Sequence, residues 1–319
     1  MAYKCHAFYV IINKKFAKKK EGFDVGKESR QRNKGIILIV CAGFFFSLMT
    51  FFVKLSGDLP TMQKAFFRNA VAVVVAGIML IKSKESFAIK KGCRFSMLMR
   101  CACGTAGLIC NFYAIDHIHI ADANMLNKLS PFFAIIFSGF ILHEKANKIE
   151  WSAVILAFIG ALFIMKPSFN ISFLYAVIGV LGGLGAGVAY TFVRDMGKKG
   201  QSGTVIVIYF ALFSCITIFP FLIVQYKPMS LIQFSCLMLA GVAATGGQFC
   251  ITAAYTKAPA REISVFDYTQ VIFAALLGIL FLSEVPDGFS VLGYFIIIGT
   301  AIAKWEYNRR IDVKKEQVV

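Results

Sequence analysis

The sequence has few charged residues: they make up 16% of its 319 residues, whereas hydrophobic residues make up 58%. A soluble domain typically carries about 25% charged and about 45–50% apolar residues, so water is excluded as the solvent around most of this chain. Histidine is also scarce, with four residues, and the nine cysteines show no CxxC spacing. We interpret the cysteines as small apolar packing residues, and we expect no cofactor and no metal site.

Acidic residues are half as frequent as basic ones, with 17 Asp and Glu against 34 Lys and Arg, which gives a net charge of +17. In a soluble protein this excess would suggest a nucleic-acid partner. Here 27 of the basic residues lie in the N-terminal segment, in alternate loops and in the C-terminal tail, whereas the five intervening loops hold only Lys166 and Lys227. The positive-inside rule therefore predicts that both termini are cytoplasmic, with no nucleic-acid partner.

Long apolar runs dominate the rest of the chain, and each has about the length of a bilayer crossing, roughly 20 residues. They lie near residues 35–55, 63–81, 94–114, 121–142, 149–165, 172–193, 204–225, 231–255, 262–282 and 289–306. We therefore predict an all-α polytopic membrane protein with ten transmembrane helices, placed in the bilayer of a plasma membrane (a bacterial inner membrane). The short loops leave no room for a soluble catalytic or output domain.

The sequence contains an internal repeat at a constant offset of 140 residues. Gly43 matches Gly183 at this offset, and Glu144 matches Glu284 near the ends of the fourth and ninth runs. Each copy contains five spans, an odd number, so the second copy must enter the membrane from the opposite side. Inverted repeats are typical of secondary transporters, in which two similar halves rock about a site near the membrane midplane.

Four regions follow from this reading. They are a basic cytoplasmic N-terminal segment (1–34), a first repeat (35–166), a second repeat (172–306) and a cytoplasmic tail (307–319). The tract NKKFAKKK in the N-terminal segment can contact anionic lipid head groups, or it can belong to a disordered leader.

Four pieces of sequence carry a resemblance to a known family. They are AFFRN (65–69), MLMRCACG (97–104), LSPFFAIIFSGFILHEK (129–145) and VIFAALLGILFLSE (271–284). The pair of five-helix units resembles the EamA repeats of the drug/metabolite transporter superfamily. The resemblance implies a ten-helix inverted-repeat carrier with a central cavity, and it does not specify a substrate. Val271 stands where the first copy has Pro131, so a kink is expected in the first copy alone.

A polar stripe marks the fourth span of each repeat. Asn124, Asn127 and Lys128 share one helical face, and polar side chains are costly in lipid, so we expect this face to turn toward protein or water. Lys128 can face a cavity or extend its ammonium to the outer interface, and Asp267 can be functional or a buried partner. An ion pair between the two satisfies both readings. The predicted substrate-binding residues are Asn111, Tyr113, Asn124, Asn127, Lys128, Ser264, Asp267, Tyr268 and Gln270.

Four further charges near or within spans have gating or structural interpretations. Arg68 is interpreted as structural, and Arg100 can bind substrate or extend to the head groups. Glu144 and Glu284 can gate transport or sense protons, or they can anchor helix ends at the interface. The glycine run at 179–187 follows no strand, so it indicates helix packing and not a dinucleotide site.

The sequence therefore predicts a secondary transporter that moves a small polar metabolite across the plasma membrane by alternating access. Basic groups outnumber the single acid inside the spans, which favours an amino acid or a similar zwitterionic or anionic cargo, with export favoured and protons as a candidate coupling ion. An uptake carrier for a nucleotide-like metabolite is an alternative. A membrane-embedded transferase is a third class, and it would need convergent acid, base or metal ligands near one interface. The stretch DHIHIAD (116–122) resembles a metal site superficially, but its i, i+2 spacing in a loop is weak evidence for one.

Overall fold

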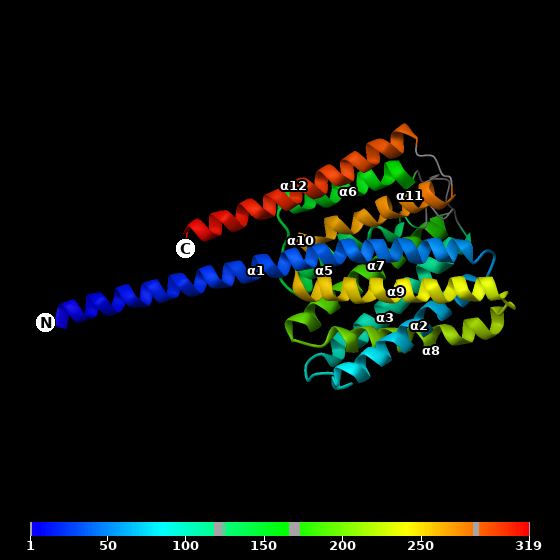
Figure 1. The fold of residues 1–319 in the computed structure, drawn as a ribbon, viewed down its shortest axis with the longest axis horizontal. Helices are drawn as coiled ribbons and strands as arrows, with labels where there is room; N and C mark the ends of the chain where they lie inside the picture. The colour runs from blue at the N-terminus through cyan, green and yellow to red at the C-terminus, as the bar shows by residue number, and fades with distance from the viewer. Residues whose placement is uncertain (1, 118–123, 125, 166–172, 283–286, 319) are drawn as a thin grey trace.

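The computed structural model describes residues 2–117, 124, 126–165, 173–282 and 287–318, and every regular element among them is a helix (Figure 1). The elements are α1 (Ala2–Leu55), α2 (Thr61–Ser83), α3 (Arg94–His117), α5 (Ser130–Ile141), α6 (Lys148–Met165), α7 (Phe173–Lys198), α8 (Gly203–Gln225), α9 (Leu231–Lys257), α10 (Ala260–Ile263), the 3-10 helix η1 (Ser264–Tyr268), α11 (Thr269–Leu282) and α12 (Gly288–Val318). The N-terminal leader continues α1 as one helix beyond the bundle, in place of a disordered segment.

Eight helical segments in the described part of the chain are long and apolar enough to cross a membrane. This finding confirms a polytopic all-α membrane protein. The fourth predicted span is represented by the 12-residue α5, which rises only about 18 Å at 1.5 Å per residue. The fifth is represented by the 18-residue α6. The count of ten crossings stays a prediction.

The two repeats run in opposite directions through the bundle. Near the start of α9, Gln233 Nε2 donates to the carbonyl oxygen of Ser56, just after the end of α1 (3.2 Å). Near the end of α9, the carbonyl oxygen of Thr256 accepts from Arg194 Nη1 in the last turns of α7 (3.2 Å). Because α9 traverses the bundle, α1 and α7 end on opposite sides. Both chain termini lie on the side of the bundle where α9 ends and α10 follows (Figure 1). We call this side the terminal end and the other the α1–α2 end.

The first helix of each repeat packs mainly on the other repeat. α1 lies against α9 and α11, and α7 lies against α3 and α5, so the two sets of contacts are equivalent under the offset of 140 residues. Glycines at equivalent positions permit close approaches between these helices. A Cβ atom on Gly43 would lie 3.1 Å from the amide nitrogen of Gln270, and one on Gly183 would lie 2.7 Å from the carbonyl oxygen of Leu126. Any side chain there would separate the two helices.

The fourth helix is broken in both repeats, so the expectation of a kink in the first copy alone is wrong. In the first copy the chain leaves the helix at Lys128 and re-enters it at α5, whose first turn contains Pro131. The second copy has no proline there but forms η1. Side-chain donors satisfy the carbonyls of this segment: Thr269 Oγ1 donates to Phe266 (2.7 Å) and Ser47 Oγ donates to Gln270 (2.8 Å). Such donors let a membrane helix depart from α geometry without proline.

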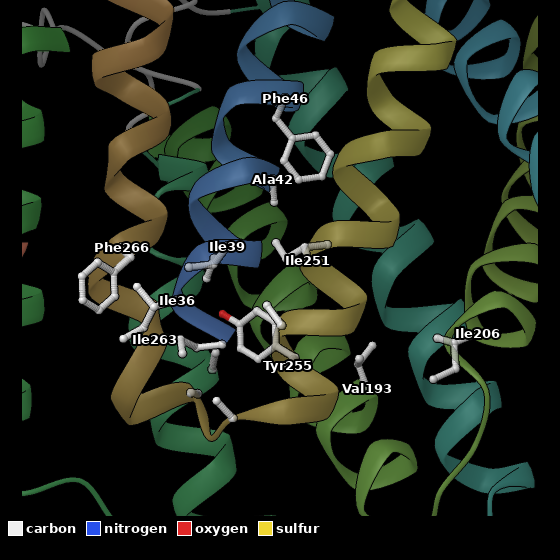
Figure 2. Packing of buried hydrophobic residues seen from close by; sticks show 14 of the residues in the cluster. Ile36, Ile39, Ala42, Phe46, Val193, Ile206, Ile251, Tyr255, Ile263 and Phe266 are labelled. Carbon is white, nitrogen blue, oxygen red and sulfur yellow. The ribbon is translucent and has the colours of Figure 1, made fainter. Parts of the chain in front are cut away.

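The hydrophobic core is concentrated near the terminal end. Figure 2 shows Ile36 and Ile39 of α1 facing Ile251 and Tyr255 of α9, with Ile263 beside them. Four of these five side chains are at most 2% exposed, and Ile36 is 8% exposed. Because lipid is as apolar as isoleucine, this packing is stabilised by close contact more than by removal from water. The terminal end is therefore the tightly closed end of the bundle.

Candidate functional site

A cavity of about 320 Å³ lies between the repeats and extends from the middle of the bundle to the α1–α2 end. Residues of both repeats line it, and many are polar. The polar and charged lining residues are Thr50, Lys54, Thr61, Lys64, Arg68, Arg100, Asn111, Asn124, Asn127, Lys128, Ser130, Tyr190, Gln248, Asp267 and Gln270. The site thus contains six of the nine predicted substrate-binding residues and both predicted arginines.

Lys128 forms the centre of a polar contact between the two broken helices. Its Nζ lies 2.9 Å from Asp267 Oδ2 and donates to Gln270 Oε1 (2.7 Å) and to the carbonyl oxygen of Asp267 (3.3 Å). The Lys128 side chain is 10% exposed, so the ammonium does not extend to the outer interface. The proposed ion pair is therefore present, and it joins the first repeat to the second.

Two of the predicted residues lie behind the cavity wall. Tyr268 is fully buried and donates its hydroxyl to the carbonyl oxygen of Lys128 (3.0 Å), 140 residues away. Lys128 and Tyr268 are therefore repeat equivalents that contact each other across the molecular pseudo-axis. Ser264 is fully buried too, and it does not line the cavity. Tyr268 and Ser264 therefore pack behind the residues that line the cavity.

Arg100 points into the bundle. Its guanidinium lies 4.0 Å from the ring centroid of Phe210, and its Nη2 donates to Gln248 Oε1 (3.1 Å). The side chain folds over Gly104, where a Cβ atom would lie 2.7 Å from Arg100 Nη1. Because Gly104 is one turn farther from the terminal end, the guanidinium extends away from the nearer head groups. The alternative of a head-group contact is therefore wrong for this residue.

Glu144 lies in an ionic cluster at the closed terminal end, outside the cavity. Its Oε1 accepts from Arg194 Nη2 (3.1 Å) and lies 2.7 Å from Lys198 Nζ. Arg194 also reaches the last turn of α9 through Thr256, so the cluster joins the ends of the fourth, sixth and eighth spans. Glu284, the repeat equivalent of Glu144, lies outside the described residues. Residues 118–122 of the stretch DHIHIAD also lie outside them.

Tyr113 is also outside the cavity. Its ring stacks on His117 (4.1 Å between centroids), and 39% of the residue is exposed. The sequence analysis missed Tyr190 and Gln248, both of which line the cavity. A glutamine inside an apolar span was the available signal for Gln248. For Tyr190 the signal was its polar repeat equivalent, Thr50.

Comparisons with known proteins agree with this architecture. A model of the EamA-like transporter family matches residues 33–166 and 173–303. The pseudopaline exporter CntI of Pseudomonas aeruginosa (strain UCBPP-PA14) is 33% identical over 272 residues, which cover 84% of this chain and 95% of the exporter. Solute carrier family 35 member G1 of Homo sapiens is 27% identical over 292 residues, covering 85% and 80%. A solved crystal structure superposes with a TM-score of 0.77 at 13% identity, covering 87% and 99%, which shows the fold alone.

These similarities confirm transport over the transferase alternative, because the matched family and the relatives named above are transporters and not enzymes. The chain is therefore a multi-pass membrane transporter with a small-molecule substrate. Two separate matches to one family model cover both halves of the cavity wall. The chain belongs to the EamA-like transporter family.

Proposed function

We propose that this protein is a secondary carrier that exports a small zwitterionic or anionic metabolite across the plasma membrane by alternating access. The terminal end, from which both termini emerge, is the cytoplasmic side in this proposal, as the positive-inside rule predicts. The structure then corresponds to an outward-facing state.

The observation that carries the proposal is the unequal environment of residues that the repeat makes equivalent. Val193 is fully buried at the terminal end, whereas its equivalent Val53 is only partly buried and lines the cavity. Arg194 lies in the ionic cluster, whereas its equivalent Lys54 is exposed at the cavity rim. Two inverted repeats that exchange these environments would close one end and open the other, which is alternating access.

The size and lining of the cavity support a small polar cargo. A volume of about 320 Å³ is at the lower end of the range for ligand pockets, about 300–1,000 Å³. Polar groups from both broken helices face this space, so a cargo bound there contacts both repeats. Export is favoured because one relative, at 33% identity, is an exporter.

Cysteine accessibility tests the alternating-access part of this proposal. In a variant without the nine native cysteines, single cysteines replace Val53 and its repeat equivalent Val193. A membrane-impermeant maleimide is expected to label Val53→Cys, which lines the cavity, from outside the cell. The buried Val193→Cys should be labelled from the cytoplasmic side of inverted vesicles once the carrier changes state. A cargo that drives the change should move the two labelling rates in opposite directions. Rates that rise and fall together would refute two alternating states.

Metabolite release tests the export part of this proposal. The compounds released by cells that express the wild type are compared with those released by cells that express matched variants. A compound released by wild-type cells and retained by cells carrying Asp267→Asn identifies the cargo. Lys199→Gln, a change at an exposed side chain near the end of α7, is the control and should release as much as the wild type. Release that is the same in all three strains would contradict the proposal. If protons are the coupling ion, an imposed pH gradient should drive release in the wild type and not in Asp267→Asn.

A further inference from the structure

The described part of the cavity wall carries an unbalanced positive charge. Five cationic side chains line it, from Lys54, Lys64, Arg68, Arg100 and Lys128, and Asp267 supplies the carboxylate. Asp267 is already paired with Lys128, so this pair is electrically neutral. The uncompensated charge in the deeper part of the cavity is therefore that of the two arginines.

Arg100 is held in place without being neutralised. Phe210 contacts the face of its guanidinium, and Gln248 accepts one hydrogen bond, but neither group carries a negative charge. Arg100 is 2% exposed, and its Nε has no acceptor within the described chain. The uncharged partners fix the orientation of the guanidinium and leave its charge available.

Arg68 of α2 has even fewer partners. The residue is 8% exposed, its Nε is buried without an acceptor, and no carboxylate of the described residues pairs with it. Arg68 and Arg100 line the same cavity. A buried charge without a partner is costly, and two like charges near each other add to the cost. A structural arginine would normally be hydrogen-bonded to carbonyls or carboxylates, and Arg68 has no such bond to the residues that the structure describes.

We propose that Arg68 and Arg100 form an anion subsite that binds a carboxylate of the cargo, and that the cargo carries a net negative charge. This inference rests on the proposed export function and chooses, within it, an anionic over a zwitterionic cargo. Guanidinium groups match the geometry of a carboxylate and stay protonated. The ammonium of a zwitterion would need an anionic acceptor, and the lining carboxylate, Asp267, already accepts from Lys128.

Four probes of equal chain length and different charge test the subsite directly. They are succinate (a dianion), 4-aminobutyrate (a zwitterion), 1,4-butanediol (neutral) and putrescine (a dication), each titrated against the purified full-length protein in detergent. A ligand that binds the folded state raises the melting temperature by mass action, so the concentration dependence gives its Kd. Succinate is expected to bind most tightly and putrescine least. Equal stabilisation by 4-aminobutyrate or putrescine, or no stabilisation by succinate, would overturn the proposal.

Substitution of the arginines locates the binding. Arg68→Gln and Arg100→Gln should each weaken succinate binding about 10-fold to 100-fold, as expected for the loss of a charge-assisted hydrogen bond. Arg68→Lys and Arg100→Lys keep the charge and should restore part of the affinity. Lys199→Gln removes the same charge from an exposed position and should leave the Kd unchanged. An equal loss in Lys199→Gln, or no loss in the arginine variants, would refute the subsite.

A ligand-free measurement guards against variants that simply fold poorly. Because Arg68 is a buried charge that pairs with no carboxylate in the described part of the chain, Arg68→Met should melt at a higher temperature than the wild type when no ligand is present. A lower melting temperature would identify Arg68 as a structural residue and overturn the assignment. Inorganic phosphate is a further probe, and stabilisation by phosphate without stabilisation by succinate would contradict a carboxylate ligand.

The subsite and the export function can fail separately. Succinate binding that depends on both arginines, with no release of any compound in the export assay, would refute export and leave the subsite. Release of a cargo that is insensitive to Arg68→Gln and Arg100→Gln would refute the subsite and leave export.

Discussion

Removing the charge of Lys128 while keeping Asp267 should destabilise the protein more than removing both charges. In Lys128→Met the thioether side chain fills a similar volume, and the carboxylate of Asp267 stays in a cavity wall where only 10% of its side chain is exposed. Gln270 Oε1 also loses the hydrogen bond that it accepts from Lys128 Nζ (2.7 Å). The single variant therefore leaves a charge and an amide without their partners.

The separation of the charges sets the size of the effect. At 2.9 Å, and with an effective dielectric constant of about 20, two unit charges attract each other by about 6 kcal/mol. Part of this attraction offsets the cost of removing both ions from water, so breaking one buried pair typically costs about 3–5 kcal/mol. At about 2 °C per kcal/mol, Lys128→Met should lower the melting temperature by about 6–10 °C.

A double-mutant cycle measures the coupling between Lys128 and Asp267. The melting temperatures of Lys128→Met, Asp267→Leu and the double variant are compared with that of the wild type in the same detergent. The double variant should be more stable than either single variant, because it leaves no unpaired charge. Lys199→Gln breaks an ion pair in which the lysine side chain is 43% exposed, and it is the control, with an expected change of about 0–1 kcal/mol. Additive losses in the double variant would refute the reasoning.

Two further predictions concern the closed end and the helix contacts. Glu144→Gln removes the anion that holds Arg194, so it should increase maleimide labelling of Val193→Cys from the terminal side, whereas unchanged labelling would exclude a gating role. Gly185→Val should lower the free energy of unfolding by about 1–3 kcal/mol, because a Cβ atom there would lie 2.6 Å from a carbonyl oxygen of α3. Gly139→Ala, which has open space, should raise the free energy of unfolding slightly, and equal effects of the two variants would argue against this contact.

The membrane architecture could be predicted from the sequence because it depends on quantities that are local in the chain. The thickness of the bilayer sets the length of the apolar runs, and the positive-inside rule sets the placement of the basic residues. The offset of 140 residues relates Gly43 to Gly183 without any knowledge of their contacts. The ion pair of Lys128 with Asp267 could also be anticipated, because each residue is expensive in lipid and Asp267 directly precedes Tyr268, the repeat equivalent of Lys128. Both inferences rest on the cost of polar groups in lipid and on the internal repeat, which can be read from the sequence alone.

The positions of other side chains depended on packing that no local pattern encodes. The direction of Arg100 is set by the space over Gly104 and by the ring of Phe210, which lies on a different helix. The break in the second fourth-position helix is stabilised by donors from elsewhere, including Ser47 of α1, and not by a proline in its own sequence. Tyr190 was missed for a similar reason: its role depends on which face of α7 borders the cavity.

The first helix of each repeat packs on the other repeat, so we expect that the two repeats do not move as two separate rigid bodies. With α1 seated on α9 and α11, and α7 seated on α3 and α5, neither half possesses a complete interface of its own. A polypeptide cut between α6 and α7 should yield two fragments that are insoluble or degraded singly and that assemble when synthesised together. In the proposed alternating-access cycle, we expect each rigid body that moves to contain helices from both repeats.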